Sequence, residues 1–294
     1  MINSENHKSK AVLSLLAGVM LMGFSAIFIK SANAPGIVTA WYRMTIGAVI
    51  LSIPFIVSQI NPVKPLNIKG VKLAVLAGAC FGLDMALWAS GVVLSNATLP
   101  TLFANLAPIW VGLGAMIFFK ERSRKGFWVG VAVAIIGFIL LSAKGLNGSN
   151  RLVMGIFLGG LAGLFYSIFY LFAQNGRKLL DTISFHFIST ASASVFLTIL
   201  MLSFRYDFIG YDHHSYLMFL GIGVGVQVFG WLCITYTQGH MPARIIAPTV
   251  LAQPVITAIL AFFLLDEQLT ILHKLGGAVI IAGIYIVHIT RNKD

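Results

Sequence analysis

The sequence predicts an all-α integral membrane protein of ten transmembrane helices, arranged as two inverted five-helix repeats. Composition, the spacing of apolar segments and an internal repeat support this prediction. Of the 294 residues, 58% are hydrophobic and only 10% are charged, and the mean hydropathy is +0.91. These values lie far from those of a soluble domain.

Apolar segments long enough to cross a bilayer recur along the whole chain. Because five spans per half is an odd number, the second half must enter the membrane from the opposite side, which makes the repeat an inverted one. We expect the ten spans at about 11–30, 36–57, 71–93, 98–119, 126–143, 153–174, 182–203, 215–238, 243–264 and 274–290.

A repeat at one fixed offset relates the two halves. Each copy holds an apolar helix with one proline, a charged turn with a glutamate, and a second apolar helix with two glycines seven residues apart. A shift of 146 residues, without a gap, superposes Ala97 on Ala243, Pro108 on Pro254, Glu121 on Glu267, Gly130 on Gly276 and Gly137 on Gly283. The polar stretch 144–150 separates the copies. We therefore expect a first repeat at 1–146 and a second repeat at 147–294.

The Lys and Arg residues predict the orientation. With a cytoplasmic N-terminus, fourteen of the twenty fall in inside segments, five fall outside, and Arg43 lies within a span. This bias predicts that both termini are cytoplasmic, in a cytoplasmic (inner) membrane. It also accounts for the net charge of +11, so no nucleic-acid partner is expected. Residues 8–34 resemble a signal peptide, but the apolar run is longer than usual, and we expect an uncleaved first span.

The chain resembles the drug/metabolite transporter superfamily, in its EamA-type branch with two EamA-like halves. The repeated proline, glutamate and glycine positions carry this resemblance, together with Trp41-Tyr42-Arg43 early in the second span. The resemblance implies ten-helix exporters or exchangers of small metabolites. It also implies that helices one to four and six to nine surround a central cavity, which helices five and ten brace.

Two charged residues inside spans are the first candidates for the site, because a charge in a membrane is costly and usually functional. Counting along the spans places Arg43 and Asn105 about 10 Å, and Asp84 about 13 Å, below the outer edge. We therefore expect them to share one layer. Arg43 suits a carboxylate. Asp84 suits an ammonium group or the exchange of a proton for coupling, since a carboxyl group out of water can titrate near neutral pH.

Each of these residues also has a purely structural interpretation. Arg43 and Asp84 can form a structural ion pair between two helices. Asn105 can hydrogen bond across a helix interface. Trp88, one turn after Asp84, can line a cavity or lie at the interface.

The second half offers uncharged candidates for the same cavity. Gln227 occupies about the position that Asp84 has in the first half, and Gln253 lies near mid-membrane. Trp231, one turn after Gln227, can stack on a substrate or simply pack. His186 can titrate, but a histidine at the cytoplasmic interface is the safer interpretation. The segment 212–214 (Asp-His-His) is expected to be a solvated loop, and no metal site is predicted.

The repeated residues outside the site have structural interpretations. Pro108 and Pro254 lie at matched places inside spans four and nine, and each is expected to kink its helix as a hinge or as a static bend. Glu121 and Glu267 precede spans five and ten, where a negative charge favours a helix N-terminus. The glycines of these spans predict a close helix contact, within a scaffold or in a homodimer.

These observations predict a secondary transporter, not an enzyme, that exports small metabolites across the bilayer by alternating access. Amino acids or similar zwitterions are the best match, because Arg43 and Asp84 carry opposite charges at one depth. Cationic drugs or other metabolites are the alternative substrates. A membrane enzyme acting on lipid, or a sensor, is a weaker alternative. No phosphate-binding loop, zinc-protease motif or nucleophile elbow occurs in the sequence, so no cofactor and no direct use of ATP are expected.

Overall fold

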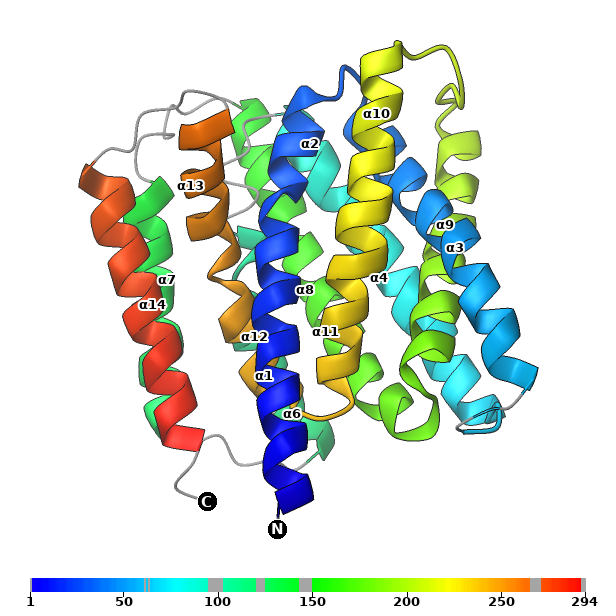
Figure 1. Ribbon diagram of the computed structural model, residues 1–294. Coiled ribbons are helices and arrows are strands. Elements are labelled where there is room, and N and C mark those ends of the chain that lie inside the picture. Colours follow the sequence, from blue (N-terminus) through cyan, green and yellow to red (C-terminus); the bar gives the residue numbers. More distant parts are fainter. Residues whose placement is uncertain are drawn as a thin grey trace.

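The structure, a computed structural model, describes residues 2–60, 62, 64–94, 103–119, 125–142, 150–264 and 271–291. Within these ranges the chain forms helices and turns, and no strand. The helices lie side by side in one bundle, and α1 begins at the same end of the bundle at which α14 ends (Figure 1). We call this end the terminal end.

The described helices follow the ten predicted spans in order. The first half contains α1 (Ile2–Gly23), α2 (Ser25–Ser31), α3 (Gly36–Ile60), α4 (Ile68–Leu94), α6 (Ala107–Phe119) and α7 (Lys125–Ser142). The second half contains α8 (Asn150–Leu179), α9 (Thr182–Ser203), α10 (His213–Gly221), the π-helix η2 (Ile222–Gly230), α11 (Trp231–Gln238), α12 (Ala243–Val250), α13 (Gln253–Leu264) and α14 (Ile271–Arg291).

Seven helical segments of the described chain are long and apolar enough to cross a membrane. They are Ser9–Ile29, Gly36–Ile60, Ile68–Gly91, Val153–Leu179, Thr182–Ser203, His213–Gln238 and Ala243–Leu264. Three shorter apolar helices, Ala107–Ile117, Lys125–Gly137 and Lys274–Thr290, fall on the other three predicted spans. Large apolar side chains also point outward, such as Ile53 on α3 and Val195 on α9, as expected where lipid is the solvent. The all-helical membrane fold is therefore confirmed.

Helix pairs that pack together recur when each span is replaced by the equivalent span of the other half. In the middle of the bundle α4 packs against α8, and the corresponding α11 packs against α1. At one edge α3 packs against α9, and at the opposite edge α7 packs against α14 (Figure 1). Each of these last two pairs joins equivalent spans of the two halves. This pattern supports the predicted inverted repeat.

Both repeated prolines follow a break in their spans. The fourth span is interrupted by a turn at Asn105 and Leu106, and the ninth by a turn at Leu251 and Ala252, which lie at the same 146-residue offset. Each proline is the second residue of the helix that follows the turn. A proline is tolerated there because first-turn N–H groups need no partner within the helix. The expected kink at the proline is thus a break just before it.

The repeated glycines bring α7 and α14 into backbone contact. A Cβ atom at Gly137 would lie 2.5 Å from the backbone nitrogen of Ile280 and 2.7 Å from the carbonyl oxygen of Gly276. A Cβ atom at Gly283 would lie 2.6 Å from the carbonyl oxygen of Gly130. These glycines therefore make a helix contact within the chain. Of the two alternatives that their spacing left open, a scaffold or a homodimer contact, the structure shows the scaffold contact. Glu121 and Glu267 lie outside the described residues.

Candidate functional site

A cavity lies in the middle of the bundle, between the two halves. It has about 540 Å³ of empty space, including the part that is open to the outside. Among the predicted site residues, it is lined by Arg43, Asp84, Trp88, Asn105, Trp231 and Gln253. Arg43, Asp84 and Asn105, which we expected at one depth in the membrane, thus line one cavity.

The α3 helix presents Arg43 to this cavity from its buried face. Gly36, Ala40, Arg43, Gly47 and Leu51 are all buried and recur at spacings of three and four residues, which places them along one side of a helix. Arg43 is only 3% exposed. Its side chain therefore has to find its polar partners within the protein or in a ligand.

Three atoms partner the guanidinium of Arg43. Nε donates a hydrogen bond to Oε1 of Gln227 over 2.9 Å, and Nη1 donates to Oγ of Ser25 over 3.3 Å. Nη1 also lies 3.7 Å from the sulfur of Met85. Within the described residues, no hydrogen bond involves the second terminal nitrogen, Nη2. All three partners are uncharged, so the positive charge of Arg43 is held in place without being neutralised.

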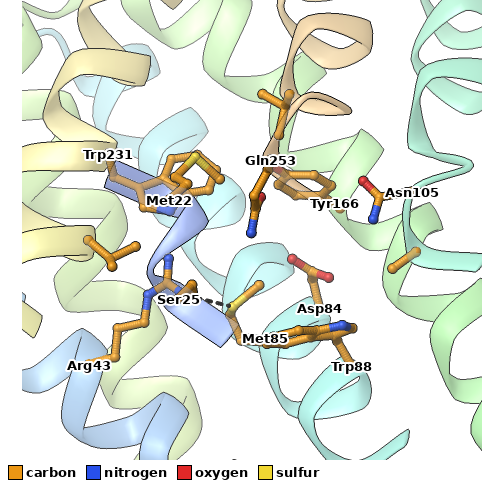
Figure 2. Close-up of a pocket in the computed structure, with 13 residues that line it drawn as sticks. Met22, Ser25, Arg43, Asp84, Met85, Trp88, Asn105, Tyr166, Trp231 and Gln253 are labelled. Carbon is orange, nitrogen blue, oxygen red and sulfur yellow. Dashed lines mark hydrogen bonds between the residues drawn. The ribbon is translucent and has the colours of Figure 1, made fainter. Parts of the chain in front are cut away.

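Asp84 lies across the cavity from Arg43. Figure 2 shows the carboxylate and the guanidinium on opposite sides, with Gln253 pointing into the space between them. Asp84 is 2% exposed, and its Oδ2 atom has no hydrogen-bond partner in the described part of the chain. No ion pair between Arg43 and Asp84 is formed. The structural ion pair that the sequence left open is therefore absent from these described residues, and both side chains line the cavity.

Gln227 does not line the cavity as predicted. Its side chain is fully buried, with Oε1 accepting from Arg43 and Nε2 donating to Oγ1 of Thr190 over 3.2 Å. Gly47 makes room for it, because a Cβ atom there would lie 2.6 Å from Cγ of Gln227. Gln227 is therefore a hydrogen-bond partner of Arg43 and not one of the residues that line this cavity.

Packed aromatic rings lie on the side of the cavity that faces the terminal end. The ring centroid of Phe81 lies 4.5 Å from that of Trp231 and 4.8 Å from that of Phe169, and all three side chains are almost fully buried. Tyr166 borders this aromatic floor and lines the cavity, and its hydroxyl lies 3.0 Å from the hydroxyl of Tyr170. Trp231 thus both lines the cavity and belongs to the floor.

His186 lies in the interior and not at the interface that we expected. It is 2% exposed, and its Nε2 lies 2.9 Å from the carbonyl oxygen of Gln227. Its Nδ1 lies 3.4 Å from Oγ1 of Thr235 on α11. The α9 helix begins only four residues earlier, but Gln227 of η2 and Thr235 of α11 contact both ring nitrogens, and the side chain is buried.

The other lining residues were not singled out from the sequence; they are Met22, Ser25, Met85, Ala104, Tyr166, Val226 and Val250. Ser25 and Tyr166 had a signal, since residues 24–28 (Phe-Ser-Ala-Ile-Phe) match residues 166–170 (Tyr-Ser-Ile-Phe-Tyr) in the other half. The methionines had none, because an apolar residue in an apolar span does not show which way it points.

The model of the EamA-like transporter family matches the chain twice, at residues 9–143 and 153–289. The chain belongs to the EamA-like transporter family. It is a multi-pass membrane transporter, and the prediction of a transporter rather than an enzyme is confirmed.

Two relatives illustrate the match across the whole chain. An uncharacterized transporter of Archaeoglobus fulgidus is 22% identical over 276 residues, which cover 93% of this chain and 94% of the relative. A probable amino-acid metabolite efflux pump of Escherichia coli is 26% identical over an alignment of 301 residues, which covers 95% of this chain and 94% of that protein.

A solved crystal structure has the same fold. It superposes with a TM-score of 0.80 over 96% of this EamA-like chain and 98% of its own length, at 15% sequence identity. At this identity the likeness speaks for the fold alone.

Proposed function

We propose that this EamA-like protein exports small zwitterionic metabolites, amino acids above all, through the cytoplasmic membrane by alternating access. Both termini would then lie in the cytoplasm, as the distribution of Lys and Arg predicts. The transporter class rests on the family match. The substrate class rests on the geometry of the cavity.

One observation carries the choice of a zwitterion, namely that Arg43 and Asp84 face one cavity without pairing with each other. A buried charge without an opposite partner is strongly destabilising. A ligand that brings a carboxylate to Arg43 and an ammonium group to Asp84 neutralises both charges at once. Nη2 of Arg43 and the carboxyl group of Asp84 would make these bonds.

The relative from Escherichia coli supports the same choice. Its name is that of a probable amino-acid metabolite efflux pump, and it aligns with 95% of this chain. Export from the cell and the amino-acid class are therefore extended to this protein as part of the proposal.

Alternating access is supported by the helix breaks and by the aromatic floor. The matched turns at 105–106 and 251–252 leave two spans discontinuous beside the cavity, as in other transporters that rock two related halves about a central site. The aromatic floor lies on the side of the cavity that faces the terminal end, so the opposite access state requires Phe81, Phe169 and Trp231 to separate. Pro108 and Pro254 would act as hinges beside the two turns.

The direct test is efflux from proteoliposomes loaded with a mixed pool of amino acids and other metabolites, with the lost compounds identified by mass spectrometry. The wild type is compared with Asp84→Asn and with Asp207→Asn, which changes an exposed loop aspartate. Selective loss of amino acids that depends on Asp84 but not on Asp207 supports the proposal. Faster loss with a pH gradient, in the wild type only, would add proton coupling through Asp84. Loss of no amino acid would contradict the proposal.

A cation exporter is the second candidate, because the aromatic floor borders the same cavity as Asp84 and aromatic faces attract cations. Such a protein would depend on Asp84 and Trp231, whereas Arg43 would be dispensable. Efflux of an organic cation that survives Arg43→Gln would decide for this candidate.

A further inference from the structure

The π-helix η2 leaves one backbone carbonyl without its usual partner. The N–H of Trp231 bonds to the carbonyl oxygens of Val226 and Val228. In an α-helix the same N–H would bond to the carbonyl oxygen of Gln227, four residues earlier. The extra residue in this turn therefore frees the Gln227 carbonyl, which lies in the buried middle of the bundle.

His186 binds this freed carbonyl from α9. A carbonyl oxygen only accepts hydrogen bonds, so the 2.9 Å contact with Nε2 requires the ring to donate from Nε2. In the neutral ring Nδ1 then accepts, and the hydroxyl of Thr235 donates to it over 3.4 Å. Thr235 is itself fixed, because its backbone carbonyl accepts a 2.9 Å hydrogen bond from Nε of Arg177. Both ring nitrogens of His186 are therefore used.

We propose that His186 is a positioning residue of the transport site, which holds η2 in its π register and so aims Gln227 at Arg43. The carbonyl of Gln227 bonds to His186, while its side chain bonds to Arg43 and Thr190. The same register places Trp231 in the aromatic floor. This inference rests on the proposed function for its transport readout, but not for its structural one.

Without His186, the Gln227 carbonyl can return to the Trp231 N–H. The extra residue is then lost from the turn, and the segment after it rotates by about 100° relative to Gln227, the angle of one residue in an α-helix. Trp231 leaves the floor, and the amide of Gln227 loses its alignment with Nε of Arg43. π-turns of this kind occur frequently at functional sites. Here a change of register in η2, which lies in the second half, alters the position of Arg43, which lies in the first half.

The test compares variants that differ in the hydrogen bond and not in the fold. His186→Leu removes the donor and keeps the volume, whereas His186→Gln retains an N–H at a similar reach. Thr235→Val removes only the bond to Nδ1 and serves as a milder change. His240→Gln is the control, because the ring of His240 hydrogen bonds to the Tyr236 carbonyl four residues earlier.

Hydrogen exchange of residues 222–238 in nanodiscs, read by mass spectrometry, reports on η2 without any ligand. We expect faster exchange in His186→Leu, a smaller effect in Thr235→Val, and exchange close to wild type in His186→Gln and His240→Gln. Unchanged exchange in His186→Leu would overturn the inference, as would equal damage by His186→Gln.

Efflux of radiolabelled leucine reports on the transport site. We expect His186→Leu to raise KM about tenfold, the effect of losing one hydrogen bond to a charged group, and Gln227→Leu to do the same. Because both act on Arg43 through one path, the double variant should be no worse than either single variant. Additive effects would overturn the inference. A wild type that moves no amino acid contradicts the proposed function instead, and the exchange experiment still decides the role of His186.

Discussion

Nε of Arg43 donates a hydrogen bond to Oε1 of Gln227 over 2.9 Å. Arg43 lies on α3 of the first half, and Gln227 lies on η2 of the second half. The cation that faces the cavity is therefore held by the opposite half. A motion of one half against the other must change this bond. The position of the Arg43 guanidinium is therefore coupled to the relative position of the two halves.

Arg43→Lys should weaken transport of amino acids although it keeps the charge. A lysine has one nitrogen and cannot reproduce the separate bonds that Nε and Nη1 make to Gln227 and Ser25. We expect KM to rise about ten- to hundredfold, corresponding to roughly 1.5–3 kcal/mol for hydrogen bonds of a charged group. Efflux kinetics in proteoliposomes measure this. A KM equal to that of the wild type would show that the charge alone suffices.

Gly47→Ala should disturb the site without touching a lining residue. The added Cβ atom would lie 2.6 Å from Cγ of Gln227, so the amide has to move away from Arg43. We expect a higher KM and little change in the amount of folded protein. Gly160→Ala on α8 is the matched control, since nothing lies within 4 Å of its added Cβ atom. Equal kinetics of the two variants would argue against the role assigned to Gln227.

Gly137→Ala should lower stability rather than transport specificity. Its Cβ atom would lie 2.5 Å from the backbone nitrogen of Ile280 on α14, and backbone atoms cannot yield as a flexible side chain can. Overpacking of this kind costs about 1–3 kcal/mol. Thermal unfolding in detergent should show a lower Tm than for the wild type, and the substrate preference should be unchanged. A Tm at the wild-type value would mean that α7 and α14 separate easily.

Asp212 should make the end of α10 sensitive to acid. Hydrogen bonds from the hydroxyl and the backbone N–H of Ser215, and from the amide of Asn33, lower the pKa of Asp212 to about 2. A lowered pKa means that Asp212 stabilises the fold above its ordinary pKa of about 3.9, and that this contribution disappears as the pH falls toward 2. Asn caps helices as well as Asp does but does not titrate. The Tm of the wild type should therefore fall relative to that of Asp212→Asn between pH 4 and pH 2, and parallel curves would refute this.

The residues of the cavity were largely predictable because charge inside a membrane span is rare and depth follows from counting. Arg43, Asp84 and Asn105 came to one cavity from their distances to the span ends. Gln227 lies at the level of Arg43, to which it hydrogen bonds, but the sequence does not show whether its side chain points to Arg43 or into the cavity.

Other features depend on packing between distant segments, which a single sequence does not reveal. His186 lies close to the start of its helix, where an interface is the natural expectation, but η2 and α11 cover it. We expected kinks where the structure has helix breaks, at 105–106 and 251–252, because a proline indicates that a helix is disturbed but not whether it bends or breaks. The repeat offset, by contrast, predicted that the two disturbances would match, and they do.

In the proposed site, Arg43 and Asp84 bind opposite ends of one zwitterion. The most direct measurement compares efflux of leucine, of its decarboxylated amine and of its deaminated acid in the wild type, Arg43→Gln and Asp84→Asn. We expect the wild type to prefer leucine, Arg43→Gln to lose the preference over the amine, and Asp84→Asn to lose the preference over the acid. Identical preferences in all three proteins would contradict it.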